Sequence, residues 1–267
     1  MSRRPRIVAC DLDGTLVRSD GTVSDRTVKA LHRAEEGGAT VVFVTGRPPR
    51  WMHDVATRTG VRGLAICANG ALVYDLGERR VIYSRLLPPE ISQALLPRLR
   101  NAFPGIAFAV ETEAGFAREP NYRARYDVGQ EHRVAPAEEL LAEPVAKLLA
   151  RHEDMTSDEL LDAAREIVGD QATLTHSSSG LGGALLEISA PGVSKATTLE
   201  LLCEQRGLTF EDVLAFGDMP NDLPLLSWAG SAWAMANAHP DVLAAVDDVT
   251  TINDDDGVAR VLEDVFD

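Results

Sequence analysis

Short runs of apolar residues recur along the chain, and each run stops at a small or polar residue. The runs occupy residues 7–10, 41–44, 64–68, 213–216 and 232–236. Their length, their content of Val and Ile and the turn residues after them are typical of buried strands. Helical patterns lie between many of them, as at 24–36, which starts at a capping serine, and at 194–205, which runs into Gly207. Strands that alternate with helices predict a mostly parallel sheet covered on both faces.

The middle of the chain has a different pattern. We expect helices at 89–102 and 157–168 and strands at 106–111, 115–119, 145–150, 172–176 and 184–189, with a polar stretch at 121–133. Pro97 lies within the first of these helices and argues against it. The mixture of helices and short strands indicates an α+β module, residues 85–187, inserted into a larger α/β sheet domain of residues 1–84 and 188–267.

Composition and charge exclude several classes of protein and partner. Apolar residues make up 45% of the chain and charged residues 25%, as in folded soluble proteins. The formal net charge of −15 should repel a phosphate backbone, so we expect no nucleic-acid partner.

No segment approaches the roughly 20 apolar residues that span a bilayer. The apolar run at 7–10 is too short for a signal peptide, so we expect no membrane association and a cytoplasmic location. The three cysteines, Cys10, Cys67 and Cys203, have no metal-site spacing and are expected to be buried thiols.

Polar residues stand at or just past the ends of the predicted strands: Asp11, Thr45, Asn69, Asp218 and Asn237. Asp, Asn and Thr also favour turns, so any one of these positions could be only structural. In an open α/β sheet, however, ligands bind beyond the carboxyl ends of the strands. Together the five residues predict a phosphate or metal site at this edge.

The Asp-Leu-Asp-Gly-Thr run at 11–15 follows the first predicted strand directly. Two carboxylates two residues apart on an extended chain point to the same side. Phosphoryl transfer through an enzyme intermediate needs a nucleophile and a second group that protonates the leaving oxygen and then activates water. Asp11 and Asp13 have suitable spacing for these two roles.

With this run, the sequence resembles the haloacid dehalogenase superfamily, whose first motif is Asp-x-Asp-Gly-Thr after the first strand. Its second motif matches Thr45-Gly46-Arg47, its third matches Lys195, and its fourth matches the Gly-Asp-Met-Pro-Asn-Asp run at 217–222. The resemblance covers residues 7–75 and 187–267. It implies a Rossmann-like core in which Thr45, Gly46, Arg47, Lys195 and Asn221 bind phosphate or substrate.

The resemblance also implies a Mg²⁺ ion, held by the side chains of Asp11 and Asp218 and the backbone carbonyl of Asp13, with Asp222 and Asn221 close by. Electrostatics supports this implication, because four carboxylates would repel one another and an incoming phosphate unless a divalent cation neutralised them. Mg²⁺ prefers oxygen ligands and fits such a site.

Further runs resemble the Cof-type phosphatases, namely 69–71, 236–240 and 253–258. This branch carries a cap domain between its second and third motifs, so the inserted module is interpreted as the cap. Two positions depart from the common pattern, since Ala196 and Ala236 stand where many relatives have Gly. Both residues are small, and we expect little effect. In the cap, Tyr122, Arg123, Arg125, His132, His176 and residues 177–179 could meet a substrate, although a solvated surface is the simpler interpretation.

The predicted function is Mg²⁺-dependent hydrolysis of a small phosphorylated metabolite, such as a sugar phosphate, a nucleotide or a cofactor precursor, through an aspartyl phosphate. A phosphosugar mutase shares the motifs and the cap, and a phospho-accepting signalling module would also use Asp11. A dehalogenase fits less well, because a halide needs no acid at Asp13. The sequence leaves the substrate, the cap residues that select it and the oligomeric state open.

Overall fold

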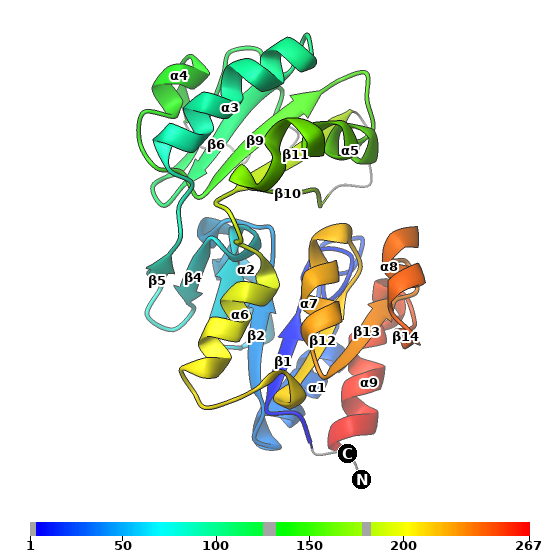
Figure 1. The fold of residues 1–267 in the computed structure, drawn as a ribbon. Coiled ribbons are helices and arrows are strands. Elements are labelled where there is room, and N and C mark those ends of the chain that lie inside the picture. The colour runs from blue at the N-terminus through cyan, green and yellow to red at the C-terminus, as the bar shows by residue number, and fades with distance from the viewer. Residues whose placement is uncertain (1–3, 125–131, 178–182) are drawn as a thin grey trace. The chain divides into compact units, whose positions relative to one another are not determined.

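The computed structural model describes residues 4–124, 132–177 and 183–267 and divides the chain into two compact units (Figure 1). The first unit combines Met1–Tyr83 with Ser194–Asp267, and the second is Ser84–Val193. The domain limits expected at 84/85 and 187/188 stay predictions, and strand β11 of the second unit runs on to Ser189. None of the helices in the described part of the chain is long and apolar enough to cross a lipid bilayer.

The first unit is built on an eight-stranded sheet in the order β14-β13-β12-β1-β2-β3-β4-β5. Its strands are β1 (Ile7–Cys10), β2 (Thr40–Val44), β3 (Leu64–Cys67), β4 (Leu72–Asp75), β5 (Arg80–Ser84), β12 (Val213–Gly217), β13 (Ser231–Met235) and β14 (Val249–Thr250). The strands from β14 to β3 are parallel to their neighbours, and β4 is antiparallel to β3. The prediction of a mostly parallel α/β sheet is therefore confirmed.

The central strands carry apolar residues on both sides, and helices therefore cover both faces of this sheet. Its helices are α1 (Asp25–Glu36), α2 (Met52–Thr59), α6 (Lys195–Glu204), α7 (Leu223–Trp228), α8 (Pro240–Ala245) and α9 (Gly257–Phe266). Ile7 and Ala9 of β1 pack in one core with apolar residues of α6, α7 and α8. Helices α1 and α9 pack against each other on the other face (Figure 1). All four residues of β1 are buried, which places the end of β1 deep within the unit.

The second unit contains a six-stranded sheet in the order β10-β11-β9-β6-β7-β8. Its strands are β6 (Ala107–Thr112), β7 (Gly115–Arg118), β8 (Arg133–Val134), β9 (Lys147–His152), β10 (Thr173–Thr175) and β11 (Ala184–Ser189), and its helices are α3 (Pro89–Ala102), α4 (Ala137–Leu140) and α5 (Ser157–Val168). These pairings are antiparallel except that of β7 with β8. The expected inserted α+β module is thus present. The segments that enter and leave this unit are tied together, since Arg85 Nη2 donates to the carbonyl of Pro191 at 2.6 Å.

Helix α3 continues through Pro97, although that residue argued against a helix. Pro97 lies on the exposed face of α3. A proline inside a helix removes one backbone hydrogen bond, and water can reach the freed carbonyl on an exposed face. The apolar positions Leu95, Leu96 and Leu99 are buried on the other side, so packing outweighs the cost of the proline.

Candidate active site

Three predicted site residues lie together because three neighbouring parallel strands end beside one another. Strands β12, β1 and β2 are adjacent in the sheet and end immediately before Asp218, Asp11 and Thr45. The three residues are buried, with exposed fractions of 5%, 5% and 1%. In open α/β sheets this edge is where ligands bind. The site is therefore positioned by the sheet itself.

The turn after β1 fits closely against Asp218. Gly14 has a φ of +82°, and a Cβ built on it would lie 2.2 Å from Asp218 Oδ2, so no other residue fits here without rearrangement. The Thr15 hydroxyl donates to Asp218 Oδ1 at 2.8 Å. The last two residues of the 11–15 run therefore hold the carboxylate of Asp218 beside that of Asp11.

Lys195 joins two of the carboxylates. It is the first residue of α6, which Ser194 caps by accepting from the backbone N–H of Thr197. Lys195 Nζ donates to Asp11 Oδ1 and to Asp222 Oδ1, both at 2.6 Å. Only 1% of Lys195 is exposed, so these bonds are made away from water. Asp11 and Asp222 lie on different loops, and Lys195 holds these two loops together.

Asp222 has a second task besides accepting from Lys195. Its Oδ2 accepts from the backbone N–H groups of Asp218 at 3.1 Å and Met219 at 3.0 Å. Asp222 is completely buried and ends the short 3₁₀ helix Pro220–Asp222. It therefore fixes the loop on which Asp218 stands.

Burial and mutual repulsion govern the charges of this cluster. Ligand atoms of Asp11, Asp218 and Asp222 lie within 4.8 Å of one another. Burial raises the pKa of Asp11 well above its ordinary value, against the opposing effect of Lys195. Burial and the neighbouring Asp222 raise the pKa of Asp218 to about 7. Burial alone would lower the pKa of Lys195, but Asp11 and Asp222 outweigh it and the pKa is raised.

These three carboxylates fit a hard divalent cation. They outnumber Lys195, which contacts two of them, Asp11 and Asp222. The ligand atoms that they offer are all oxygens, the ligand type of Mg²⁺ and Ca²⁺. The side chain of Asp13 lies outside this group of ligand atoms. The expected part of Asp13 in binding metal, through its backbone carbonyl, stays a prediction.

Thr45, Gly46 and Arg47 form a turn after β2. The Thr45 hydroxyl accepts from the backbone N–H of Arg47 at 3.0 Å. The Arg47 guanidinium binds Asp13 through two parallel hydrogen bonds, Nε to Oδ2 at 2.8 Å and Nη2 to Oδ1 at 2.5 Å. The side chain of Asp13 is 62% exposed, unlike that of Asp11. The two aspartates of the first motif therefore have different surroundings. Asp11 is buried and contacts Lys195, whereas Asp13 is exposed and contacts Arg47.

Asn221 lies beside Asn69, the polar residue that follows β3. Asn221 Nδ2 donates to Asn69 Oδ1 at 3.0 Å, and both residues are buried. Asn237, one of the five polar residues expected at this edge, also contacts the turn after β1. Asn237 Nδ2 donates to the carbonyl of Gly14 at 2.8 Å. The contact of Thr15 with Asp218 was not predicted, and the signal that could have pointed to Thr15 is its place in the matched run at 11–15.

The polar cap residues have mixed surroundings. The side chain of Arg123 is 82% exposed, in agreement with a solvated surface. That simpler interpretation is wrong for Tyr122 and His176, which are 4% and 1% exposed. His176 Nε2 lies 2.8 Å from Asp158 Oδ1, and Arg151 lies over the ring of Tyr122. Arg125 and residues 178–179 lie outside the described residues.

Comparisons with known proteins identify relatives along almost the whole chain. HMP-PP phosphatase of Cronobacter sakazakii is 29% identical over 246 residues, 90% of this chain and 87% of the relative. The 5-amino-6-(5-phospho-D-ribitylamino)uracil phosphatase YitU of Bacillus subtilis is 28% identical over 277 residues, 100% of this chain and 99% of the relative. The enzyme class expected from the motifs, a phosphatase, is therefore confirmed.

Solved structures and a family model agree with these relatives. A haloacid dehalogenase-like hydrolase from B. subtilis matches with a TM-score of 0.82 and 25% identity, over 97% of this chain and 99% of the other. One from Bacteroides thetaiotaomicron matches with a TM-score of 0.75 and 26% identity, over 98% and 100%. The model of the haloacid dehalogenase-like hydrolases matches residues 8–262, which confirms the resemblance seen in the motifs. This protein belongs to the haloacid dehalogenase-like hydrolase family.

Proposed function

We propose that this enzyme is a Mg²⁺-dependent phosphatase of small phosphorylated metabolites and that it acts through an aspartyl phosphate on Asp11. The observation that carries this proposal is the pair of 2.6 Å bonds from buried Lys195 to Asp11 and Asp222. They hold Asp11 in one orientation at the carboxyl end of the central strand β1. Such fixed geometry is what an attacking carboxylate needs.

The proposed reaction has two steps. An oxygen of Asp11 forms a bond to phosphorus while the bond to the leaving oxygen breaks, and Asp13 donates a proton to that oxygen. Water then attacks the phosphorus of the aspartyl phosphate and gives its proton to Asp13. The bond between phosphorus and Asp11 breaks, so inorganic phosphate leaves and Asp11 is restored. The buried ammonium of Lys195 and the Thr45 hydroxyl stabilise the charge on the phosphoryl oxygens.

A divalent cation fits the same scheme. The carboxylates of Asp11 and Asp218 would hold it, with Asp222 nearby. When bound, the cation offsets the repulsion between these carboxylates and a phosphate dianion. We propose Mg²⁺ because phosphate enzymes commonly bind it through one or two carboxylates and the substrate phosphate.

The Arg47–Asp13 pair supports the assignment of Arg47 to substrate binding. A guanidinium binds a carboxylate and a phosphate with the same two-point geometry. A phosphorylated substrate can therefore take the place of Asp13 on Arg47. This exchange would release Asp13 for proton transfer at the moment when the substrate is in place.

The proposed substrates are phosphoric monoesters such as sugar phosphates, nucleotides or cofactor precursors. The named relatives support this class, since one is called an HMP-PP phosphatase and one a phosphatase of a ribitylaminouracil phosphate. Both match this chain over nearly its full length. A screen of such compounds for phosphate release, with Mg²⁺ and with EDTA, would identify the preferred one.

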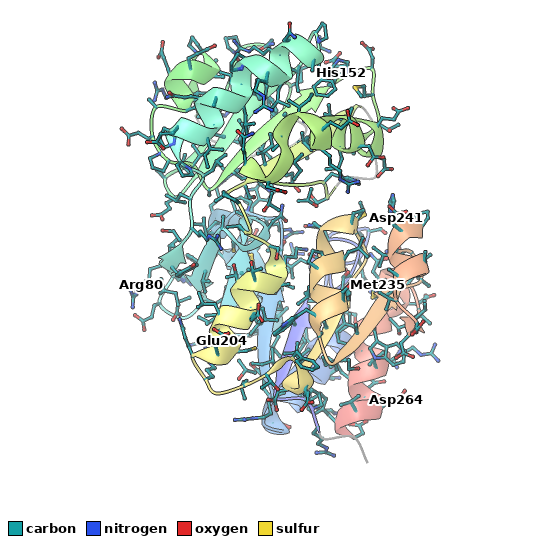
Figure 2. The ribbon with its side chains drawn as sticks, in the orientation of Figure 1. Arg80, His152, Glu204, Met235, Asp241 and Asp264 are labelled. Atoms are coloured by element: carbon teal, nitrogen blue, oxygen red, sulfur yellow. The ribbon has the colours of Figure 1, made fainter. Side chains whose placement is uncertain are left out.

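The decisive variant is Asp11→Asn, which keeps the size of the side chain and removes the nucleophilic carboxylate. We expect it to abolish Mg²⁺-dependent hydrolysis of p-nitrophenyl phosphate and the covalent phosphate that mass spectrometry detects after rapid quenching. Asp264→Asn is the control, because Asp264 is exposed near the end of α9 (Figure 2) and should leave the rate unchanged. Full activity in Asp11→Asn would refute the assignment.

A further inference from the structure

The three residues after β3 have an unusual backbone. Ala68, Asn69 and Gly70 all have positive φ, at 50°, 58° and 109°. Residues with a side chain rarely adopt this region, and here two of them do so in succession. Ala68 and Asn69 are 1% and 3% exposed, so the conformation is enforced by the surrounding protein. Strain of this kind gathers at functional sites.

The backbone of this segment holds the turn that carries Thr45 and Arg47. The N–H of Ala68 donates to the carbonyl of Arg47, and the N–H of Asn69 donates to the carbonyl of Thr45, both at 3.0 Å. Both N–H groups therefore face the same neighbouring turn. The segment thus fixes the ends of the Thr45–Arg47 turn.

Gly70 places the segment against the first turn of α6. A Cβ on Gly70 would lie 2.2 Å from the carbonyl oxygen of Ser194, the residue before Lys195. The Gly70 carbonyl accepts from the Thr198 hydroxyl at 2.8 Å. This close approach of two backbones ties the segment to the helix that begins with Lys195.

The side chain of Asn69 makes the third connection, to the loop of the fourth motif. Asn69 Oδ1 accepts from Asn221 Nδ2 at 3.0 Å. Asn221 Oδ1 is buried and has no hydrogen-bond partner among the described residues. In the described contacts, the amide of Asn221 is therefore oriented by Asn69 alone. Asn221 immediately precedes Asp222, one of the three clustered carboxylates.

We infer that Asn69 is a positioning residue for phosphoryl transfer. It sets the orientation of the Asn221 amide through its side chain, while its left-handed backbone secures the Thr45 turn. This inference rests on the proposed function, because it assigns Asn69 to the same reaction. Asn69 does not itself contact the reacting atoms in this assignment.

Glycine and alanine substitutions separate the two contributions of Asn69. Asn69→Gly keeps the left-handed backbone accessible and removes the side chain, with its bond to Asn221. Asn69→Ala removes that bond and also strains the backbone, so its melting temperature should fall below that of Asn69→Gly. Arg79→Gly is the matched control, because Arg79 also has a positive φ, 54°, but is exposed in the turn between β4 and β5.

The test is a double-mutant cycle on p-nitrophenyl phosphate hydrolysis with Mg²⁺. Asn69→Gly should lower kcat about tenfold with little change in KM, since the lost interaction orients a group for the transition state. In an Asn221→Ala background the same substitution should change kcat by less than about twofold, because its target is gone. Arg79→Gly should behave as the wild type.

Two results would overturn the inference: a wild-type rate in Asn69→Gly, or equal losses from that substitution in both backgrounds. If the wild type released no phosphate at all, the proposed function would fail instead. The cycle would then be measured by calorimetry of orthovanadate binding with Mg²⁺. Coupling between the two asparagines in that binding would uphold the orientation of Asn221 by Asn69, and its absence would reject it.

Discussion

Replacement of Lys195 by methionine tests the central electrostatic feature of the site. The substitution keeps the length of the side chain and removes the one charge that contacts both Asp11 and Asp222. Lys195 is 1% exposed, so water cannot screen the loss. Breaking a buried ion pair from one side costs about 3–5 kcal/mol. The free energy of unfolding of a whole domain is about 5–15 kcal/mol, so the loss should be large and easily measured.

Magnesium should offset part of this loss. Without Lys195 the three carboxylates lose their cation, so a divalent ion should bind them more tightly than in the wild type. A ligand at 100 times its Kd stabilises the folded state by about 2.7 kcal/mol. Urea unfolding in EDTA and in saturating Mg²⁺ measures both quantities. We expect lower stability in EDTA and a larger stabilisation by Mg²⁺ in Lys195→Met than in the wild type, with hydrolysis reduced about 10²-fold or more.

Lys147→Met is the matched control. Lys147 also forms a buried ion pair, with Glu187, but it belongs to the second compact unit. Its loss should lower stability without changing the stabilisation by Mg²⁺. The electrostatic account would be refuted if Lys195→Met were as stable as the wild type in EDTA, or if Mg²⁺ stabilised both lysine variants equally.

Two further substitutions test the packing and the surface charges of the first unit. Gly70→Ala should destabilise the protein by about 2–6 kcal/mol, because positive φ strain and a backbone clash with Ser194 add together. Gly21→Ala, which also has a positive φ but meets nothing within 4 Å, should cost only about 1–2 kcal/mol by thermal unfolding; equal losses would show that the clash is unimportant. Glu263→Gln should remove about 0.2–1 kcal/mol at neutral pH, since a hydrogen bond from Arg26 holds the pKa of Glu263 below its ordinary value of 4.5. A lowered pKa in the folded state means that this contribution is complete above pH 4.5 and is lost as the pH falls through the lowered pKa, so wild type and variant should converge in acid urea titrations. A difference that persisted below that pKa would contradict the role of the charge.

Much of the fold could be predicted because the buried elements carry their signal locally. The predicted strand at 7–10 matches β1, and the predicted helix at 157–168 matches α5, which is capped by Thr156. The edge strand β5 was not predicted, because its residues alternate between exposed and half-buried and Ile82 is 42% exposed. Such a strand lacks the continuous apolar run by which central strands are found.

The candidate site could be predicted only in part. Residues that follow strands were found, because the end of an apolar run marks the edge of the sheet. The pairing of Arg47 with Asp13 and the double contact of Lys195 were not, since they depend on distances between loops that are remote in sequence. The burial of Tyr122 and His176 was missed for the same reason. The sequence around a polar residue does not show which residues pack over it or which residues it forms hydrogen bonds with.

The bond between Arg85 and Pro191 has a consequence for how the chain folds. Strand β1 lies between β2 and β12, and the hydrogen bond from Thr15 to Asp218 spans 203 positions of sequence. Contacts between such distant residues slow folding, because a long loop must close before they form. Once the inserted unit has folded, with its entry and exit held together at Arg85 and Pro191, the loop that remains to be closed is far shorter. The folded insertion therefore lowers the entropic cost of completing the eight-stranded sheet of the first unit.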